Sequence, residues 1–191
     1  DPSKCILCGR CVRVCEEVQA CTTLEFAHRG NETSIHTAFN QGINTSSCIN
    51  CGQCIMVCPT GALHEKNHLS GIQEALNNPD IKVVAQIDPG LPVSLSKTFN
   101  FKSGKDLSGL VIAALKKIGF DQVFDTSFAT DMRIMEEAHL LKERLDNNAP
   151  GPLFSSDCPA WIKYAEQFAP GFLPQISPLK SPQQMLGTLL N

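Results

Sequence analysis

Two blocks of four cysteines constrain this chain more than any other feature. The first reads CILCGRCVRVC and the second reads CINCGQCIMVCP, so both follow the pattern Cys-x2-Cys-x2-Cys-x3-Cys. A disulfide framework does not repeat cysteines at such short intervals, because neighbouring sulfurs would compete for the same partners. Metal ligation by thiolates does use this spacing, and it requires a reducing compartment in which thiols persist. The cysteines therefore predict a metal-centred N-terminal module.

The spacing within each block is the one that wraps three sulfurs around one corner of an iron–sulfur cube. In two-cluster ferredoxins, the fourth cysteine of each block ligates the other cluster. The expected ligands of two 4Fe–4S clusters are therefore, for one cluster, Cys5, Cys8, Cys11 and Cys58, and for the other, Cys48, Cys51, Cys54 and Cys15. We predict an α+β ferredoxin-like domain over residues 1–66 that passes single electrons.

A pair of zinc sites is the alternative interpretation of the two blocks. Zinc knuckles use two Cys-x2-Cys pairs rather than a triplet followed by a fourth cysteine, so the pattern favours iron–sulfur clusters. Gly9 and Gly52 follow the second cysteine of each block, where close approach of the backbone to a cluster would leave no space for a side chain. Cys21 lies outside both blocks and is predicted to be a small buried hydrophobe.

Composition narrows the class of protein further. The 191 residues are 42% hydrophobic and 18% charged, as in a soluble globular protein. The net charge is −3 without a basic block, which gives no support for a nucleic-acid partner. No apolar run reaches the roughly 18 residues of a membrane span, and no signal peptide precedes the first cysteine. We expect the cytoplasm or another reducing, anaerobic compartment, with no membrane partner.

The remainder of the chain alternates between strand-like and helix-like segments. The expected elements are a linker helix within 67–80, strands at 81–87, 120–124 and 152–156, and helices between Ser108 and Gly119, at 131–145 and from Pro159 onward. This alternation predicts an α/β domain with a parallel sheet over residues 81–191. Ser108 is expected to cap the first of its helices, and Gly119 to end it.

Two further expectations concern packing and ligands in this α/β domain. The helix at 131–145 should bury one apolar face, made of Ile134, Ala138, Leu141 and Leu145. Ligands of a parallel sheet gather beyond the carboxyl ends of its strands. Asp88-Pro89-Gly90 and Ser156-Asp157-Cys158 follow predicted strands, so both segments are candidate cofactor positions.

Three segments resemble the iron-only (FeFe) hydrogenases, and the likeness covers essentially the whole chain. GFDQVFDTSFATDMRIMEEA (119–138) is similar to a strand and helix of that family. SSDCPAW (155–161) resembles its Thr-Ser-Cys-Cys-Pro-Gly-Trp motif, and LKSPQQMLG (179–187) resembles its Lys-Ser-Pro-Gln-Gln segment. The resemblance implies the first part of a catalytic domain that holds an H-cluster, in which a 4Fe–4S cluster is bridged to a two-iron centre.

The resemblance implies a role for several residues. Cys158 corresponds to a ligand of the 4Fe–4S part of the H-cluster, and Pro89 to a residue beside the two-iron centre. Asp157 takes the place of the family's proton-donor cysteine, and a carboxylic acid can also carry a proton. Glu137 and Ser177 match further residues of the family's proton path. Each also has an ordinary alternative: Asp157 as an N-cap for the helix at Pro159, Glu137 on a solvated helix face, and Ser177 before a turn.

The chain also departs from the family pattern. Leu140 stands where the family has an outer glutamate, and Asp88 and Gly90 flank Pro89 where the family usually has alanine and a small residue. The three other cysteine ligands of the H-cluster lie in two later motifs, which these 191 residues do not contain. We therefore expect a truncated chain, and an H-cluster only when the missing C-terminal part is present.

The implied function is electron relay through two 4Fe–4S clusters to an H-cluster, for reversible reduction of protons to H2. The alternative is a non-catalytic electron-transfer or scaffold subunit derived from the same family, and a third reading is a protein of cluster assembly or sensing. Expected partners are ferredoxin or another low-potential redox protein, and further hydrogenase subunits. A basic patch around Lys4, Arg10 and Arg13 is a candidate docking surface for the redox protein.

Overall fold

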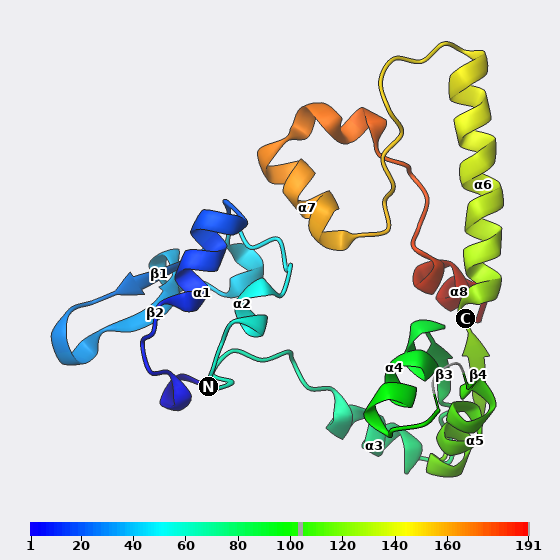
Figure 1. The fold of residues 1–191 in the computed structure, drawn as a ribbon, viewed down its shortest axis with the longest axis horizontal. Helices are drawn as coiled ribbons and strands as arrows, with labels where there is room; N and C mark the ends of the chain where they lie inside the picture. The colour runs from blue at the N-terminus through cyan, green and yellow to red at the C-terminus, as the bar shows by residue number, and fades with distance from the viewer. Residues whose placement is uncertain (103–104, 191) are drawn as a thin grey trace. The chain divides into compact units, whose positions relative to one another are not determined.

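The computed structural model describes residues 1–102 and 105–190, and these form two compact units (Figure 1). Unit 1 combines Asp1–Lys66 with Cys158–Pro174. Unit 2 combines the described parts of Asn67–Asp157 and Gln175–Asn191. Within the described residues, no helix has both the length and the apolar character needed to span a membrane.

Unit 1 contains a ferredoxin-like arrangement of two short helices and a hairpin. Helix α1 (Arg10–Arg13) runs into a π-helical turn (Val14–Val18), and α2 (Gln53–Met56) is its counterpart in the second block. Strand β1 (Leu24–Ala27) pairs antiparallel with β2 (Ser34–Thr37). Short 3-10 turns fill the remainder of this region, at Pro2–Lys4, Gly30–Glu32, Ala38–Asn40 and Ile43–Thr45.

A glycine precedes each of the two short helices because the backbone is left-handed at that position. Gly9 and Gly52 cap α1 and α2 in the left-handed conformation, with φ of 70° and 74°. A side chain is strained at such angles, so glycine is favoured at both positions. At Gly9 an added Cβ would also lie 3.1 Å from the ring of Phe26, whereas no described atom within 4 Å would contact a Cβ on Gly52.

The second segment of unit 1 is helix α7 (Pro159–Phe168), followed by a 3-10 segment at Pro170–Gln175. Proline at the first position of α7 fits the predicted helix start, because its missing N–H would have no partner there. Trp161 is half-buried, and its ring lies 6.4 Å from both Tyr164 and Phe172, centroid to centroid. Ala165 is fully buried, so α7 packs through one aromatic and small-residue face.

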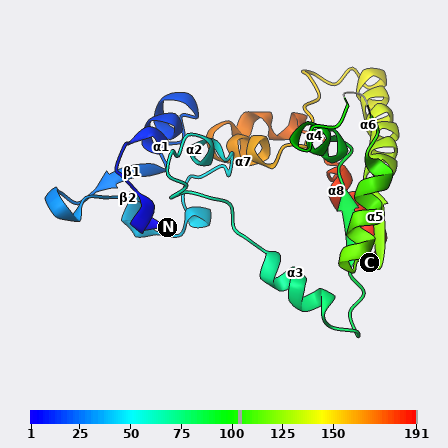
Figure 2. The same cartoon turned by 60° about the horizontal axis from the view of Figure 1, so that its bottom comes forward.

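Unit 2 is an α/β arrangement built on a parallel pair of strands. Strand β3 (Val84–Ile87) pairs with β4 (Gln122–Asp125), and Val84 lies opposite Gln122. The helices are α3 (Leu69–Leu76), α4 (Gly90–Thr98), α5 (Ser108–Ile118), α6 (Ser127–Asp146) and α8 (Pro182–Leu190). Helix α3 lies in the connecting segment before β3 (Figure 2). The predicted fold class, a ferredoxin-like domain plus an α/β domain with a parallel sheet, is confirmed.

The predicted third strand at 152–156 is wrong. Within the described residues this segment forms a single parallel bridge, between Phe154 and Ile176, and does not join β3 or β4. The bridge rests on two backbone bonds of 2.8 Å, from the Phe154 N–H to Gln175 and from the Ser177 N–H to Phe154. Pro152, Pro174 and Pro178 flank the bridge. Proline has no N–H to donate, which limits a ladder at such positions.

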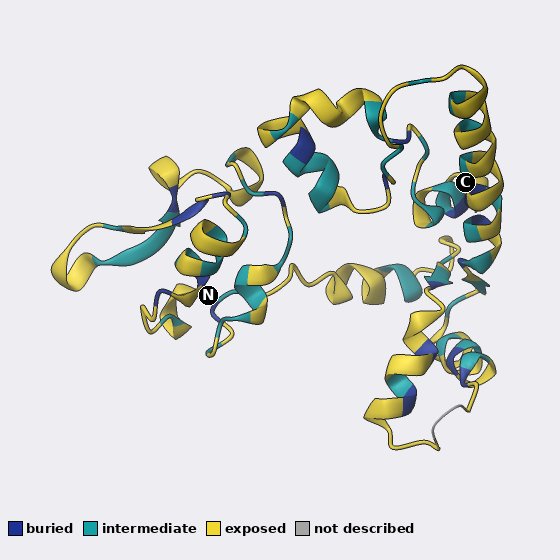
Figure 3. Ribbon diagram, turned by 45° about the horizontal axis from the view of Figure 1, so that its top comes forward, coloured by how far each residue is buried: buried dark blue, intermediate teal, exposed yellow. Residues whose placement is uncertain are grey.

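The predicted buried face of the helix at 131–145 is also wrong. Ile134, Leu141 and Leu145 are exposed by 58%, 47% and 67%, and Ala138 is exposed as well. Figure 3 shows much of α6 in the colour of exposed residues. The buried residues of α6 are instead Ala129 and Arg133. They lie four residues apart and so share one face. Helix α6 packs against α8. Contacts with α8 and with the chain around Ser155 decide which face is buried, rather than hydrophobicity.

Helix α5 begins differently from the prediction and ends as predicted. Ser108 is the first helical residue rather than the cap, and Leu107 occupies the cap position without a side-chain bond. The carboxylate of Asp106 accepts a 2.8 Å hydrogen bond from the Ser108 N–H. Gly119 closes the helix with φ of 126°, a conformation that glycine adopts readily.

Candidate functional site

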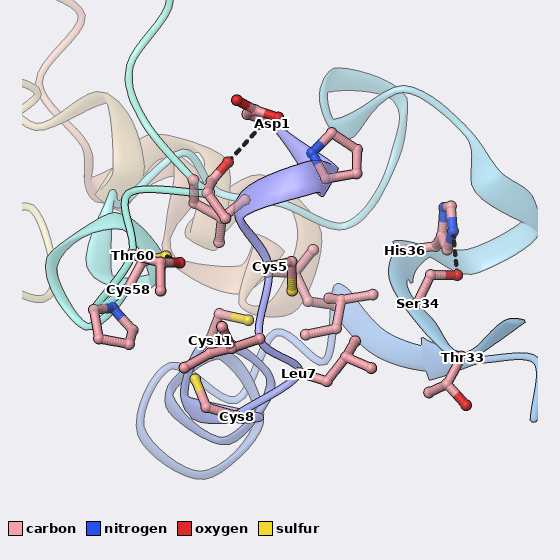
Figure 4. A pocket seen from close by; sticks show the side chains of 17 residues that line it. Asp1, Cys5, Leu7, Cys8, Cys11, Thr33, Ser34, His36, Cys58 and Thr60 are labelled. Atoms are coloured by element: carbon pink, nitrogen blue, oxygen red, sulfur yellow. Dashed lines mark hydrogen bonds between the residues drawn. The ribbon is translucent and has the colours of Figure 1, made fainter. Parts of the chain in front are cut away.

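The cysteines of the two blocks line two separate cavities in unit 1. The larger, of about 250 Å³, is lined by Cys5, Cys8, Cys11 and Cys58 together with apolar side chains (Figure 4). The smaller, of about 30 Å³, is lined by Cys15, Cys48, Cys51 and Cys54. Each cavity thus gathers three cysteines of one block and the fourth cysteine of the other.

The donor set of these cavities suits an iron–sulfur cube. Four thiols in an apolar wall are the ligands that such a cube takes in proteins. Among the described residues, no three His, Cys, Asp or Glu side chains converge on a position that could hold a single metal ion. The cysteines line the walls of each cavity.

The thiols differ in how readily they ionise. Burial raises the pKa of Cys11, and burial together with the neighbouring Cys48 and Cys51 raises the pKa of Cys54 to about 11. Backbone N–H groups, that of Leu63 foremost, lower the pKa of Cys58 to about 7. Metal ligation requires thiolates, so loading these cavities with iron would release protons from the buried cysteines.

Backbone and side-chain donors surround the second cavity. The N–H groups of Thr23 and Asn50 donate to the sulfurs of Cys15 and Cys48, each at 3.3 Å. Lys163, on α7, donates from Nζ to the Cys48 carbonyl at 3.2 Å. No motif singled out Lys163, because its partner lies 115 residues earlier in the chain. Cys21 is 1% exposed and borders the same cavity, so the prediction of a small buried residue is confirmed.

Unit 2 brings two of the predicted proton-path residues together around a buried arginine. Arg133 is 5% exposed. Its guanidinium forms an ion pair with Asp157 through NH1, and NH2 contacts Glu137 at 3.3 Å and the Ser155 hydroxyl at 3.0 Å. Its Nε is buried without a hydrogen-bond partner in the described structure. Arg133 therefore cross-links α6 to the segment that precedes Cys158.

Sequence reasoning missed Arg133, although one signal pointed to it. Arg133 precedes Glu137 by four residues, so both side chains lie on the same face of α6. The alternative role of Asp157 as an N-cap is wrong, because Cys158 is the cap residue of α7 and no side chain caps that helix. Glu137 is not freely solvated either, since only 28% of its side chain is exposed.

The remaining candidate residues lie outside this cluster. Ser177 is 3% exposed, and its hydroxyl accepts from the Leu179 N–H at 3.4 Å. In the described residues, no hydrogen bond or ion pair joins Ser177 to Glu137 or Asp157. Pro89 is exposed at the start of α4, and the Asp88 carboxylate accepts from the Gly90 N–H at 2.7 Å within its own turn. Cys158 is exposed at the start of α7.

Family comparisons match both halves of the chain. The model described as "4Fe-4S dicluster domain" matches residues 4–62. The model described as "Iron only hydrogenase large subunit, C-terminal domain" matches residues 81–191, which is more than half of the chain. The protein therefore carries iron–sulfur clusters of the 4Fe–4S kind.

Individual relatives agree with the family models. The chain is 43% identical to iron hydrogenase 1 of Clostridium pasteurianum over 188 residues, and 41% identical to the NADP-reducing hydrogenase subunit HndD of Solidesulfovibrio fructosivorans over 195 residues. These alignments cover 98% and 99% of this chain but 33% of each relative. The chain thus spans about a third of the length of these relatives. It is also 33% identical over 123 residues to the cytosolic Fe-S cluster assembly factor NAR1 of Scheffersomyces stipitis, covering 64% of this chain and 23% of that protein.

Solved structures give the same assignment. A structure of an FeFe hydrogenase, determined in work on oxygen inactivation of the H-cluster, matches with a TM-score of 0.58 and 33% identity over 65% of this chain and 34% of that chain. A variant of the apo FeFe hydrogenase HydA1 from Chlamydomonas reinhardtii matches with a TM-score of 0.56 and 35% identity, over 62% of this chain and 32% of that chain. Fold, motifs and family models agree, and the chain belongs to the iron-only hydrogenase large-subunit family.

Proposed function

We propose that this chain relays electrons through two 4Fe–4S clusters toward an H-cluster that reversibly reduces protons to H2. The observation that carries the proposal is that each cysteine cavity draws three thiols from one block and the fourth from the other. Residues 1–66 would form the two-cluster domain, 67–80 the linker, and 81–191 the N-terminal part of the hydrogenase α/β domain. Ferredoxin or another low-potential redox protein would supply the electrons, with further hydrogenase subunits as other partners.

Separate sets of cysteines would hold the clusters. The first cluster would be held by Cys5, Cys8, Cys11 and Cys58, and the second by Cys48, Cys51, Cys54 and Cys15. When bound, these clusters supply one-electron transfer, and the two-iron centre of an H-cluster supplies the site of proton reduction. Cys158 would be one ligand of the H-cluster, and Pro89 would line the space beside its two irons.

The proton path would use side chains near Cys158. Asp157 would hold a proton on its carboxylate, and Glu137 and Ser177 would continue the path. Arg133 bonds both carboxylates, so their separation is fixed by one guanidinium. Leu140 cannot carry a proton, so the path would leave the protein through water at that point.

Iron analysis of cysteine pairs tests the crosswise ligation. We expect about eight irons and about eight sulfides per chain after anaerobic purification. The double variant Cys5→Ala/Cys58→Ala should keep about half of the iron, because both residues would serve one cluster. The matched variant Cys5→Ala/Cys15→Ala should lose nearly all of it, because it damages both clusters. The reverse result would show that each block ligates its own cluster.

A non-catalytic electron-transfer or scaffold role is the second candidate. It is favoured by the ion pair between Asp157 and Arg133, which engages the carboxylate that replaces the family's proton-donor cysteine. The similarity to the assembly factor NAR1 adds a related role in cluster assembly. H2 evolution by the complete protein with reduced viologen separates these functions, because a scaffold would hold its iron and produce no H2.

A further inference from the structure

An open groove on unit 1 lies outside both cysteine cavities. It has a volume of about 510 Å³ and is formed by α1, the π-helical turn that follows it, and residues 56–59 after α2. Its lining includes Arg10, Arg13, Glu17, Val18, Met56 and Cys58. The groove therefore joins the two cysteine blocks at the surface.

The groove carries positive charge on a chain that is negative overall. Arg10 and Arg13 are both exposed, and they lie three residues apart, so they share one face of α1. Neither forms an ion pair within the described part of the chain, and Glu17 is the acidic residue in the lining. The chain as a whole has a net charge of −3, so this surface is a local cationic site.

The structure corrects the composition of the predicted basic patch. Lys4 does not line the groove, and its ammonium forms a 3.7 Å ion pair with Asp1. The cationic surface therefore consists of Arg10 and Arg13 without Lys4. This difference supplies a control, because Lys4 is an exposed cation of the same unit that the groove does not include.

Exposed apolar side chains complete the groove. Met56 is 81% exposed and Val18 is 69% exposed. Interfaces between proteins combine an apolar centre with charged groups that steer the encounter, and methionine is enriched in them because its side chain adapts to a partner. A neutral or cationic small molecule would gain little from such a surface, whereas an acidic protein would gain from both parts.

Cys58 connects the groove to the larger cysteine cavity. It lines both, so the same residue faces the surface and the space enclosed by Cys5, Cys8 and Cys11. A redox protein seated in the groove would therefore have a proposed cluster ligand directly beneath its contact surface. The smaller cavity shares Val14 with this groove but contributes none of its cysteines to the groove lining.

We propose that this groove is the docking surface of a small acidic one-electron carrier protein. The carrier would give up one electron and be oxidised, and the cluster that Cys5, Cys8, Cys11 and Cys58 would hold would accept that electron and be reduced. No proton and no bond are transferred. This inference rests on the proposed function, and it adds which of the two clusters receives the electron and through which face.

Stopped-flow reduction by a reduced acidic ferredoxin tests the surface. The variant Arg10→Glu/Arg13→Glu should lower the second-order rate by about tenfold or more at low ionic strength, because steering by opposite charges is lost. The difference should shrink at high salt, where charges are screened. The matched variant Lys4→Glu/Lys66→Glu makes the same change in net charge outside the groove and should keep most of the rate. Reduced methyl viologen should reduce all of these proteins equally.

If charge reversal impairs folding, other variants still test whether the groove binds the carrier. Arg10→Lys/Arg13→Lys preserves the charge and should keep the ferredoxin rate, and Met56→Ser should lower it without changing its salt dependence. Equal losses in the two Glu variants would overturn the proposal, because the effect would then follow net charge alone. No loss in Arg10→Glu/Arg13→Glu would also overturn it. Iron content measured beforehand separates this result from failure of the proposed function, in which no clusters would be present.

Discussion

Arg133 is the residue on which the proposed site in unit 2 depends. Its guanidinium is buried, and it is neutralised by Asp157 and Glu137 and bonded to Ser155. Removing a buried charge costs little if its partners can return to water, but removing a partner leaves the charge uncompensated. Asp157 can return to water, because 51% of its side chain is already exposed. The pair is therefore asymmetric, and Asp157 supports Arg133 more than Arg133 supports Asp157.

A double-mutant cycle measures how strongly the two residues of this pair are coupled. Asp157→Ala should lower the free energy of unfolding by about 1.5 kcal/mol, the low end of the range for a hydrogen bond to a charged group, because half of its side chain is exposed. Arg133→Met/Asp157→Ala should be more stable than the sum of the two single losses. Urea unfolding followed by circular dichroism gives all four values. Additivity within about 0.5 kcal/mol would mean that the ion pair contributes nothing to stability.

Lys163 is expected to set the potential of one cluster. Its ammonium lies 3.2 Å from the carbonyl of Cys48, and positive charge near a cluster favours its reduced form. Lys163→Met should lower the equilibrium constant for reduction of that cluster about tenfold, a shift of about 59 mV to more negative potential. Lys163→Arg should restore most of it. A potentiometric titration followed by EPR measures the reduction potential of each cluster. An equal shift of both potentials, or a shift of neither, would contradict this role of Lys163.

The sequence predicted which cysteines lie together, but it did not predict the burial of Arg133. The cysteines that share a cavity were predictable, because three of each set follow from local ligand spacing and the fourth follows from the crosswise ligation of two-cluster ferredoxins. Arg133 was not, because its burial depends on Ser155 and Asp157, more than twenty positions away. An arginine on a helix is normally solvated, so only the folded chain identifies this one as buried.

At the scale of elements, the start of α5 shows how a helix is fixed by a residue outside it. The carboxylate of Asp106 bonds the Ser108 N–H, one of the donors that a helix leaves free at its first turn. Bonds from the side chain and backbone of Ser108 lower the pKa of Asp106 below its usual value. The ionised carboxylate therefore stabilises the folded form.

The sign of this effect gives a pH prediction. Because the folded pKa of Asp106 is lowered, its contribution is present above the unfolded value of about 3.9 and is lost as pH falls through the folded value. Asp106→Ala should thus melt at a lower temperature than the parent at pH 7, and the two should converge as the pH falls through the lowered pKa of Asp106. Asp106→Asn keeps an acceptor without the charge, so its cap should respond less to pH. A pH-independent gap between Asp106→Ala and the parent would refute the carboxylate's role.

The sequence predicted whether these segments are helices or strands better than it predicted which segments pair and which faces are buried. Helices α5, α6 and α7 and strands β3 and β4 all lie where local periodicity places them. The segment 152–156 has the apolar character of a strand, yet prolines on both sides of the bridge limit its pairing. Helix α6 has an apolar face, yet it buries the face that carries Arg133. Pairing and burial depend on distant segments, which periodicity does not report.

At the scale of the whole molecule, unit 1 has little apolar core of its own. Its buried hydrophobic residues are small or few: Cys11, Cys21, Leu24, Ile49, Ala62 and Ala165. Domains with small cores rely on metals or disulfides for stability. We therefore expect the proposed clusters to stabilise unit 1 when they are bound.

Removal of iron should therefore unfold unit 1 selectively. After treatment with a chelator, amides of β1 and β2 should lose protection from hydrogen exchange, because cluster binding and folding are coupled there. Amides of β3 and β4, in unit 2, should keep theirs. Mass-spectrometric exchange of the holo and chelated forms makes the comparison. Equal loss in both units would mean that the clusters stabilise the whole chain rather than one part of it.

The composition of unit 1 has a consequence for how such proteins could be recombined. Its 66 N-terminal residues are joined in one compact unit by Cys158–Pro174, a segment from the hydrogenase part of the sequence, through contacts such as that of Lys163 with Cys48. A chimera that exchanged the N-terminal module at a single junction would pair it with a foreign α7. We therefore expect a functional exchange between relatives to need two further junctions, one on each side of α7, so that the module and its own helix move together.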